Sequence, residues 1–149
     1  MNDLAKRGAM MASGLMLLTA AAAALRAQEA TATTNAGVYS EVQAERGKAA
    51  YLKYCQACHG ETMNGVDVAP ALVGSTFLGN WVGLSVGELG ERVRTTMPQN
   101  NPGTLSSATT ADLIALILKA NGYASGTADL PRDGQLQLMI RIADPKPGG

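Results

Sequence analysis

The chain has 149 residues, of which 46% are hydrophobic and only 4% are aromatic. Its 12 basic and 12 acidic side chains give a formal net charge of zero, which argues against nucleic acid as a partner. A small domain with so few aromatic side chains has difficulty filling its core.

The first 27 residues predict a secretory signal peptide. Lys6 and Arg7 form a basic start, residues 9–25 are uncharged and mostly apolar, and Ala27 places a small residue at the cleavage position. The apolar stretch is shorter than the ~20 residues that a membrane-spanning helix usually needs. We therefore expect export to the periplasm, with no membrane span after cleavage. The alternative is that the segment is kept as an anchor.

The rest of the chain predicts one domain between two shorter segments. Residues 28–37 are small and polar and predict a flexible lead-in. Residues 38–123 predict an all-α domain of short helices joined by loops, because no strand pattern competes. Residues 124–149 form a C-terminal extension.

Three helices are predicted from their capping residues. The first begins after Ser40, which with Gln43 is typical of a capping box, and runs to about Tyr54. Gly47 inside it costs about 1 kcal/mol relative to alanine, so we expect another helix to approach closely there.

The second helix begins after Ser85, which with Glu88 is typical of another capping box, and turns Val86, Leu89 and Val93 inward. The third begins at Ser106 or Thr109 and ends at Asn121-Gly122. Its inward residues are expected to be Leu113, Leu116, Ile117 and Ala120.

The run Cys55-Gln56-Ala57-Cys58-His59 is the C-x-x-C-H spacing that attaches c-type haem covalently. Two thiols add to the two vinyl groups of one porphyrin edge, and the histidine that follows lies where it binds the iron. The alternatives are a disulfide, a thioredoxin-like pair and half of a zinc site. Zinc is disfavoured because the chain has two cysteines and one histidine in total. A buried haem would also supply the apolar volume that the composition lacks.

From about residue 38 to residue 130 the chain resembles a class I, mono-haem cytochrome c. The likeness consists of a helix that ends at C-x-x-C-H, a loop with a proline, a methionine before a proline and a C-terminal helix. The resemblance implies an all-α fold of short helices around one covalent haem c with its iron. Trp81 and the pieces 94–98, 102–106 and 121–123 are similar to cytochromes associated with, or fused to, pyrroloquinoline-quinone-dependent alcohol dehydrogenases.

The resemblance implies that His59 and a methionine bind the iron. Met63 is too close to His59 in sequence to reach the opposite haem face, and Met139 lies beyond the C-terminal helix. Met97 precedes Pro98 in a loop between two helices, where the family has its ligand methionine. If Met97 only fills the core, the iron is five-coordinate.

The resemblance also implies roles in the haem pocket for residues other than the iron ligands. Pro70 matches the proline whose carbonyl accepts the N–H of the ligand histidine. Leu72, Phe77 and Val93 are expected to line the haem pocket. The indole of Trp81 is expected to donate to a haem propionate, and the alternative is a half-buried packing residue.

These features predict a periplasmic electron carrier rather than an enzyme. Its electron port is expected at the haem edge, among uncharged residues such as Gln56, Ala57, Met63 and Ala69. The expected donor is a periplasmic dehydrogenase, more narrowly a quinoprotein, and the expected acceptor is another cytochrome or a terminal oxidase. One alternative is a five-coordinate haem sensor or haem enzyme. Another is a tightly bound cytochrome subunit of a dehydrogenase complex, with residues 124–149 packed along the partner.

Overall fold

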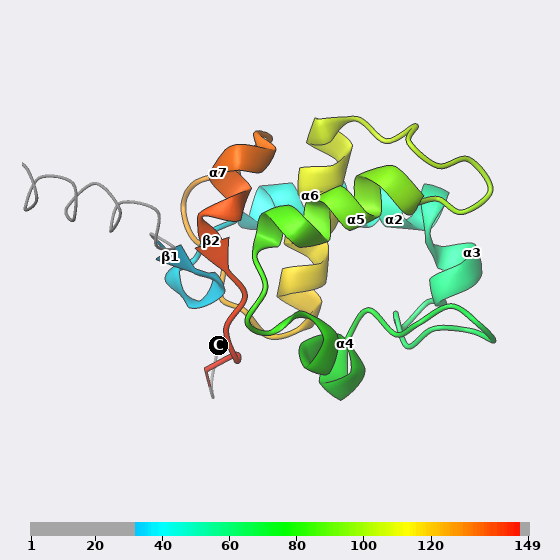
Figure 1. The fold of residues 1–149 in the computed structure, drawn as a ribbon, viewed down its shortest axis with the longest axis horizontal. Coiled ribbons are helices and arrows are strands. Elements are labelled where there is room, and N and C mark those ends of the chain that lie inside the picture. Colours follow the sequence, from blue (N-terminus) through cyan, green and yellow to red (C-terminus); the bar gives the residue numbers. More distant parts are fainter. Residues whose placement is uncertain (1–31, 147–149) are drawn as a thin grey trace, which may run out of the picture.

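A computed structural model describes residues 32–146, so the predicted signal peptide over 1–27 lies outside the described residues. Helices are the main elements within this range and each strand has two residues, which confirms the all-α prediction (Figure 1). In chain order the elements are β1 (Ala32–Thr33), the 3-10 helix η1 (Thr34–Ala36), α2 (Glu41–Tyr54), α3 (Gln56–His59), α4 (Gly74–Trp81), α5 (Val86–Thr96), α6 (Ser107–Ala120), α7 (Gly134–Leu138) and β2 (Ile140–Arg141).

Helices α2 and α6 cross at the centre of the molecule (Figure 1). Gly47 of α2 is buried and lies directly against the backbone of α6, which confirms the predicted close approach. The contact is made by Asp112 and Leu116. The close packing of α2 on α6 therefore depends on the absence of a side chain at position 47.

The main apolar core lies where α5 packs against α6. Val86 and Leu89 are buried as predicted, at 0% and 3% exposure, whereas Val93 is half-buried. Ala120 was expected to face inward but is exposed, because it is the last residue of α6. The remaining members of this core come mostly from α6 and the C-terminal extension: Tyr39, Ala44, Phe77, Ala111, Ile114, Ala115, Ile117, Leu118, Tyr123, Leu130, Ile140 and Ile142.

The caps are largely as predicted, with one difference. Ser85 and Glu88 form a complete capping box at α5, and the hydroxyl of Ser106 caps α6. The hydroxyl of Ser40 accepts from the backbone N–H of Gln43, but the Gln43 side chain does not return to the Ser40 backbone. It instead makes two hydrogen bonds to the backbone of Leu130, so only half of the predicted box is present.

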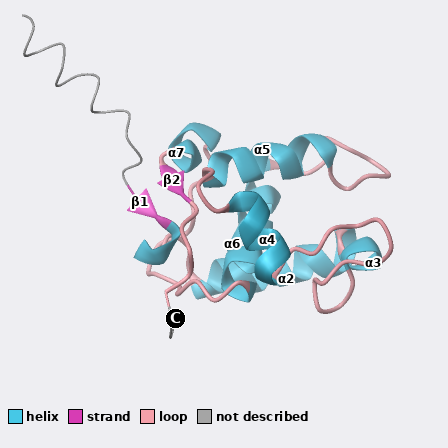
Figure 2. Cartoon of the chain, turned by 60° about the horizontal axis from the view of Figure 1, so that its bottom comes forward, coloured by secondary structure: helices cyan, strands magenta, loops and turns pink. Residues whose placement is uncertain are grey.

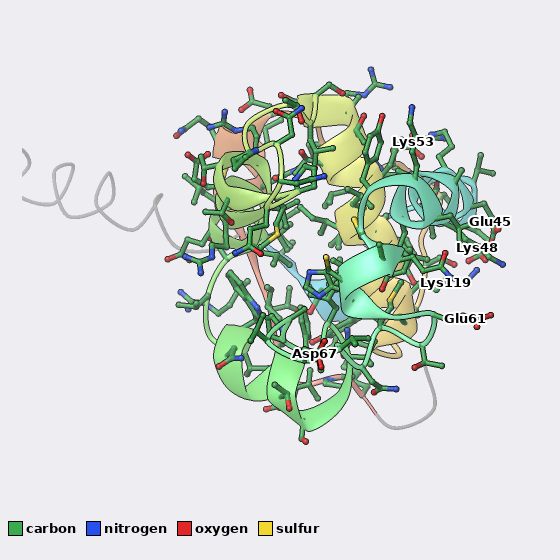
Figure 3. The ribbon with its side chains drawn as sticks, turned by 90° about the vertical axis from the view of Figure 1, so that its right-hand side faces the viewer. Glu45, Lys48, Lys53, Glu61, Asp67 and Lys119 are labelled. Atoms are coloured by element: carbon green, nitrogen blue, oxygen red, sulfur yellow. The ribbon has the colours of Figure 1, made fainter. Side chains whose placement is uncertain are left out.

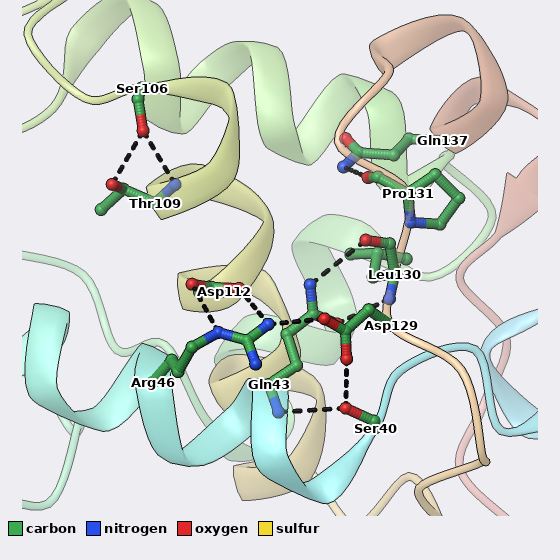
Figure 4. A network of polar contacts seen from close by, with 10 residues as sticks. All are labelled: Ser40, Gln43, Arg46, Ser106, Thr109, Asp112, Asp129, Leu130, Pro131 and Gln137. Atoms are coloured by element: carbon green, nitrogen blue, oxygen red, sulfur yellow. Dashed lines mark hydrogen bonds and ion pairs between the residues drawn. The ribbon is translucent and has the colours of Figure 1, made fainter.

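The C-terminal extension packs on its own domain over residues 124–146. Leu130, Ile140 and Ile142 are buried in the main core, at 1%, 7% and 0% exposure. Two hydrogen bonds from Gln43 and an ion pair from Arg46 fix the start of the extension to α2 (Figure 4). The start of the extension is thus part of the folded domain, and whether its outer surface also contacts a partner protein stays a prediction.

The predicted flexible lead-in is wrong for residues 32–37. Strand β1 pairs in parallel with β2, with Ala32 opposite Ile140. Thr34 is fully buried, and the side chain of Asn35 donates to the carbonyl oxygen of Asp144. The sequence pattern missed these contacts because small polar residues carry no periodic apolar signal, and their partners come from the other end of the chain.

The elements divide the molecule into two ends. Helix α3 and the loops beside it lie at one end, while β1, β2 and α7 lie at the other (Figures 1 and 2). The C-x-x-C-H run is therefore at the end opposite the contact between the two terminal segments.

Candidate functional site

The C-x-x-C-H run forms one tight turn directly after α2. The backbone N–H of Cys55 still bonds to the carbonyl of Tyr51, and the N–H of His59 bonds to the carbonyl of Cys55 at 2.9 Å. Residues three and four apart on a helical turn are neighbours on its surface, so Cys55, Cys58 and His59 share one side of α3. Cys55 is half-buried and Cys58 is exposed.

The geometry disfavours the alternative readings of this motif. The two thiols are not joined in a disulfide. Burial, and secondarily the neighbouring Cys58, raises the pKa of the Cys55 thiol to about 11, whereas a thioredoxin-like pair needs a lowered pKa. Within residues 32–146 no group of three His, Cys, Asp or Glu side chains is arranged to hold a metal ion, which disfavours a zinc site.

The ring of His59 is held in a defined orientation. Its Nδ1 lies 2.9 Å from the carbonyl oxygen of Pro70, and because a carbonyl only accepts, the proton is on Nδ1. The ring is almost buried, at 7% exposure. Nε2 is thus the nitrogen with a lone pair, and such a hydrogen bond fixes the tautomer of a metal-binding histidine and raises its basicity. Pro70 lies where the resemblance implies.

The loop between His59 and Pro70 is fixed by backbone hydrogen bonds. The N–H of Gly65 donates to the carbonyl of His59, and the hydroxyl of Tyr51 donates to the carbonyl of Gly60 at 2.7 Å. Gly65 has a φ of 80°, and a Cβ at this position would lie 2.2 Å from the carbonyl oxygen of Ala69. Only glycine fits there, which gives the Asn64-Gly65 pair a structural reason that the sequence analysis did not identify.

A second apolar cluster lies beside Cys55. Its buried members are Tyr51, Met63, Leu105, Leu113 and Leu116. Cys55, Leu72, Val73 and Val93 are partly buried and pack against this cluster.

The residues present fit a thiol-attached haem. They supply two free thiols, a histidine with one nitrogen already hydrogen-bonded, and an apolar surface next to the half-buried thiol. Leu72 packs against both the main core and the second cluster, and its place beside a haem stays a prediction.

Asn121 positions Leu72 and was not identified as a site residue from the sequence. Its side-chain amide donates to the carbonyl of Leu72 at 2.9 Å, and its side-chain oxygen accepts from the backbone N–H of Gly74 at 3.0 Å. In the sequence Asn121 reads only as a helix-ending residue, and it does cap α6. No local signal indicates its second role, because its partners lie 47 and 49 positions away.

The methionines occupy different surroundings. Met97 is half-buried and ends α5, with its N–H bonded to the carbonyl of Val93 at 3.0 Å. Met63 is buried in the second cluster at 8% exposure, so it does not contribute to an exposed edge as expected. Met139 lies between α7 and β2, at the opposite end of the molecule from α3 (Figure 1). The choice of Met97 as the second ligand stays a prediction.

Trp81 is half-buried at the end of α4 and packs against the main core. Its ring centroid lies 6.5 Å from that of Phe77. Phe77 itself is buried, at 1% exposure. No hydrogen bond from the indole is formed within the described residues, so its role toward a propionate stays a prediction.

Comparison with known proteins agrees with this reading. A family model described as "Cytochrome C oxidase, cbb3-type, subunit III" matches residues 42–117, a segment that runs from α2 into α6 and includes the C-x-x-C-H turn. No curated protein and no solved structure matches the chain.

Proposed function

This chain belongs to that c-type cytochrome family, and we propose that it is a periplasmic carrier of single electrons with His59 and Met97 as its iron ligands. The class I cytochrome c fold and a covalently bound haem c with iron follow from the family. The family supports a haem-carrying electron-transfer protein. We propose in addition that it acts as an electron carrier rather than as an enzyme.

One observation gives the main support for haem attachment through Cys55 and Cys58. Both thiols are free, and the turn that carries them ends at a histidine whose Nδ1 is bonded to the carbonyl of Pro70. When bound, haem supplies an iron that changes between the ferrous and ferric states with little rearrangement. His59 supplies Nε2 toward the iron, while Pro70 holds the ring in place.

Met97 is proposed as the second ligand because of its place in the chain and the fold. It begins the loop between α5 and α6 and is partly shielded from solvent. A thioether favours ferrous iron and raises the reduction potential relative to a second histidine. With His59 and Met97 both bound to the iron, no open position would remain for a substrate.

The proposed donor is a periplasmic dehydrogenase, which includes the quinoprotein alcohol dehydrogenases suggested by the sequence. The proposed acceptor is another cytochrome or a terminal oxidase. The matching family is described as an oxidase subunit, which supports a terminal oxidase as the acceptor. In residues 32–146 no helix is long and apolar enough to cross a membrane.

The test is to express the full chain in a host that exports and matures c-type cytochromes. Mass spectrometry of the product should give polypeptide plus one haem, and the haem should resist extraction with acidic acetone. The ferric spectrum should show a six-coordinate, low-spin iron that is reduced reversibly. Extractable haem would contradict the attachment, and a five-coordinate iron would favour the sensor or haem-enzyme alternative over the electron carrier.

A further inference from the structure

The loop that follows the C-x-x-C-H turn presents an apolar tip to solvent. Val68 is 94% exposed and Val66 is 49% exposed. The N–H of Ala69 bonds to the carbonyl of Val66 at 3.0 Å, so Val68 lies at the apex of a closed turn. Asp67 in this turn has a φ of 52°, a left-handed conformation that a non-glycine residue adopts only at some cost.

This tip is rigidly connected to the proposed iron ligand. Gly65, just before the turn, donates to the carbonyl of His59, and Leu72, just after it, donates to the carbonyl of Met63 at 2.8 Å. A Cβ at Gly60 would lie 3.4 Å from Val66, which places this valine beside the end of α3. A protein that contacts the tip is therefore held close to His59.

The charges on this loop differ from those on the rest of the fold. Neither Glu61 nor Asp67 forms an ion pair or a side-chain hydrogen bond within the described residues. Between Lys53 and Arg92 the chain contains no lysine or arginine. The two carboxylates therefore carry negative charge that no ion pair within the described residues neutralises.

Carboxylates elsewhere in the domain mostly serve the structure. They pair with lysine or arginine, or cap helices: Glu41, Glu45, Glu88, Glu91, Asp112, Asp129 and Asp133. Glu61 and Asp67, which lie in the loop after α3, are exposed and can interact with solvent or with a partner protein. Figure 3 shows Asp67 below the centre of this face and Glu61 at its right edge, with Lys53 above them.

We propose that Val66, Val68, Glu61 and Asp67 form a docking tip for a redox protein whose contact surface has an apolar socket with lysine or arginine side chains on its rim. The inference rests on the proposed electron-carrier function and specifies the chemistry of the partner. The carboxylates steer the partner and orient it, while the valines supply the apolar contact. A transient redox contact is small, so a tip of this size is sufficient.

The test uses the full holoprotein and two electron-transfer probes in stopped-flow experiments, run in the direction that the potentials favour. The protein probe is a lysine-rich cytochrome c, and the small probe is hexacyanoferrate, an anion that senses charge but offers no apolar surface. The variants are Glu61→Gln with Asp67→Asn, and Val68→Ser. The matched controls are Asp144→Asn, which removes a carboxylate without an ion pair at the end of the described chain, and Val42→Ser, which changes an exposed valine at the start of α2.

The double charge variant should slow the reaction with the protein probe about fivefold at low ionic strength, with the difference lost at high salt. The same variant should speed the reaction with hexacyanoferrate. Val68→Ser should slow the protein reaction about threefold at every ionic strength and leave the hexacyanoferrate reaction unchanged, because an apolar contact is not screened by salt. The controls should match the parent protein.

Equal rates for all variants would overturn the docking tip while leaving the electron carrier intact, provided each variant keeps its haem spectrum and midpoint potential. Loss of haem or of reversible reduction in the parent protein would instead overturn the proposed function. Sedimentation of the parent protein as a dimer that Val68→Ser converts to a monomer would reassign the tip to self-association. Val68-dependent co-sedimentation with phosphatidylcholine and phosphatidylglycerol vesicles would reassign it to lipid, and either result overturns the proposal.

Discussion

A Cβ atom built on Gly47 would lie 2.0 Å from the carbonyl oxygen of Asp112 and 3.0 Å from the Cβ of Leu116. The first distance is to backbone, which cannot move aside like the end of a flexible side chain. Helices α2 and α6 thus meet with no side chain between them at this point, and α2 leads directly into the turn that carries Cys55.

Gly47→Ala should therefore destabilise the holoprotein, although alanine normally favours a helix over glycine. Overpacking of a tight contact typically costs about 1–3 kcal/mol, and we expect the upper part of this range. The control is Gly79→Ala in α4, where a Cβ would meet nothing within 4 Å. Thermal unfolding followed by circular dichroism should show a lower Tm for Gly47→Ala and an equal or higher Tm for the control. A Gly47→Ala variant as stable as the parent would show that the helices can separate at no cost.

Gln43→Ala should be strongly destabilising because it leaves two buried backbone groups without partners. The side chain of Gln43 is buried, donates to the carbonyl of Leu130 and accepts from its N–H at 2.6 Å. An unsatisfied buried group costs about 1–3 kcal/mol, so we expect about 2–4 kcal/mol in chemical unfolding. Gln135→Ala, on the exposed surface of α7, is the matched control and should change little. Similar midpoints for the two variants would contradict a structural role for the bond to Leu130.

Met97→Ala should abolish the near-infrared charge-transfer band between methionine sulfur and ferric iron. It should also lower the midpoint potential, because the lost thioether favours the ferrous state. Met63→Ala is the control, since Met63 is buried in the second cluster and should affect stability but neither observable. Absorption spectroscopy and redox titration measure both quantities. If the band disappears in Met63→Ala and persists in Met97→Ala, the ligand assignment is wrong.

The contact that Asp129 makes between the C-terminal extension and α2 should become weaker at acidic pH. The Ser40 hydroxyl and the Arg46 guanidinium lower the pKa of Asp129 below its ordinary value of 3.8 (Figure 4). A carboxylate with a lowered pKa stabilises the fold above its ordinary pKa, and this contribution disappears as the pH falls through the lowered value.

Asp129→Asn should therefore lower the Tm slightly at pH 7, and its difference from the parent should shrink as the pH falls below the ordinary aspartate pKa of 3.8. Asp144→Asn, at an aspartate without an ion pair in the described chain, serves as the control and should show no such dependence. Melting curves across this pH range measure the effect. A difference between Asp129→Asn and the parent that stays constant down to pH 2 would argue against the ion pair with Arg46.

Several features follow from short segments of sequence. The C-x-x-C-H run specifies its own turn, because its two internal hydrogen bonds span three and four residues. The caps at Ser85 and Ser106 are equally local, since each hydroxyl accepts from an N–H three residues on. Gly47 could be identified as a contact point because glycine inside a helix is costly unless something approaches it.

Other features depend on groups that are distant in the chain. Gln43 has the right spacing to complete a capping box with Ser40, yet its side chain bonds to Leu130, 87 residues away. Asn121 ends a helix as expected, but it also holds the segment from Leu72 to Gly74. No pattern within a few residues distinguishes these roles, because each depends on which backbone groups become buried when distant segments meet.

The sequence by itself determined the cofactor chemistry, the order of the main helices and the all-α class, since these rest on residue type, local spacing and apolar periodicity. Only the tertiary structure decided that residues 32–33 pair with residues 140–141 through β1 and β2. It also decided that Glu61 and Asp67 form no ion pair within residues 32–146 and that Val68 is exposed. The physical reason is that a hydrogen bond between residues close in sequence closes only a short loop, so it costs little chain entropy and has few competing partners. A distant contact forms only when the whole chain has closed around its core, so its partners are chosen by burial and packing.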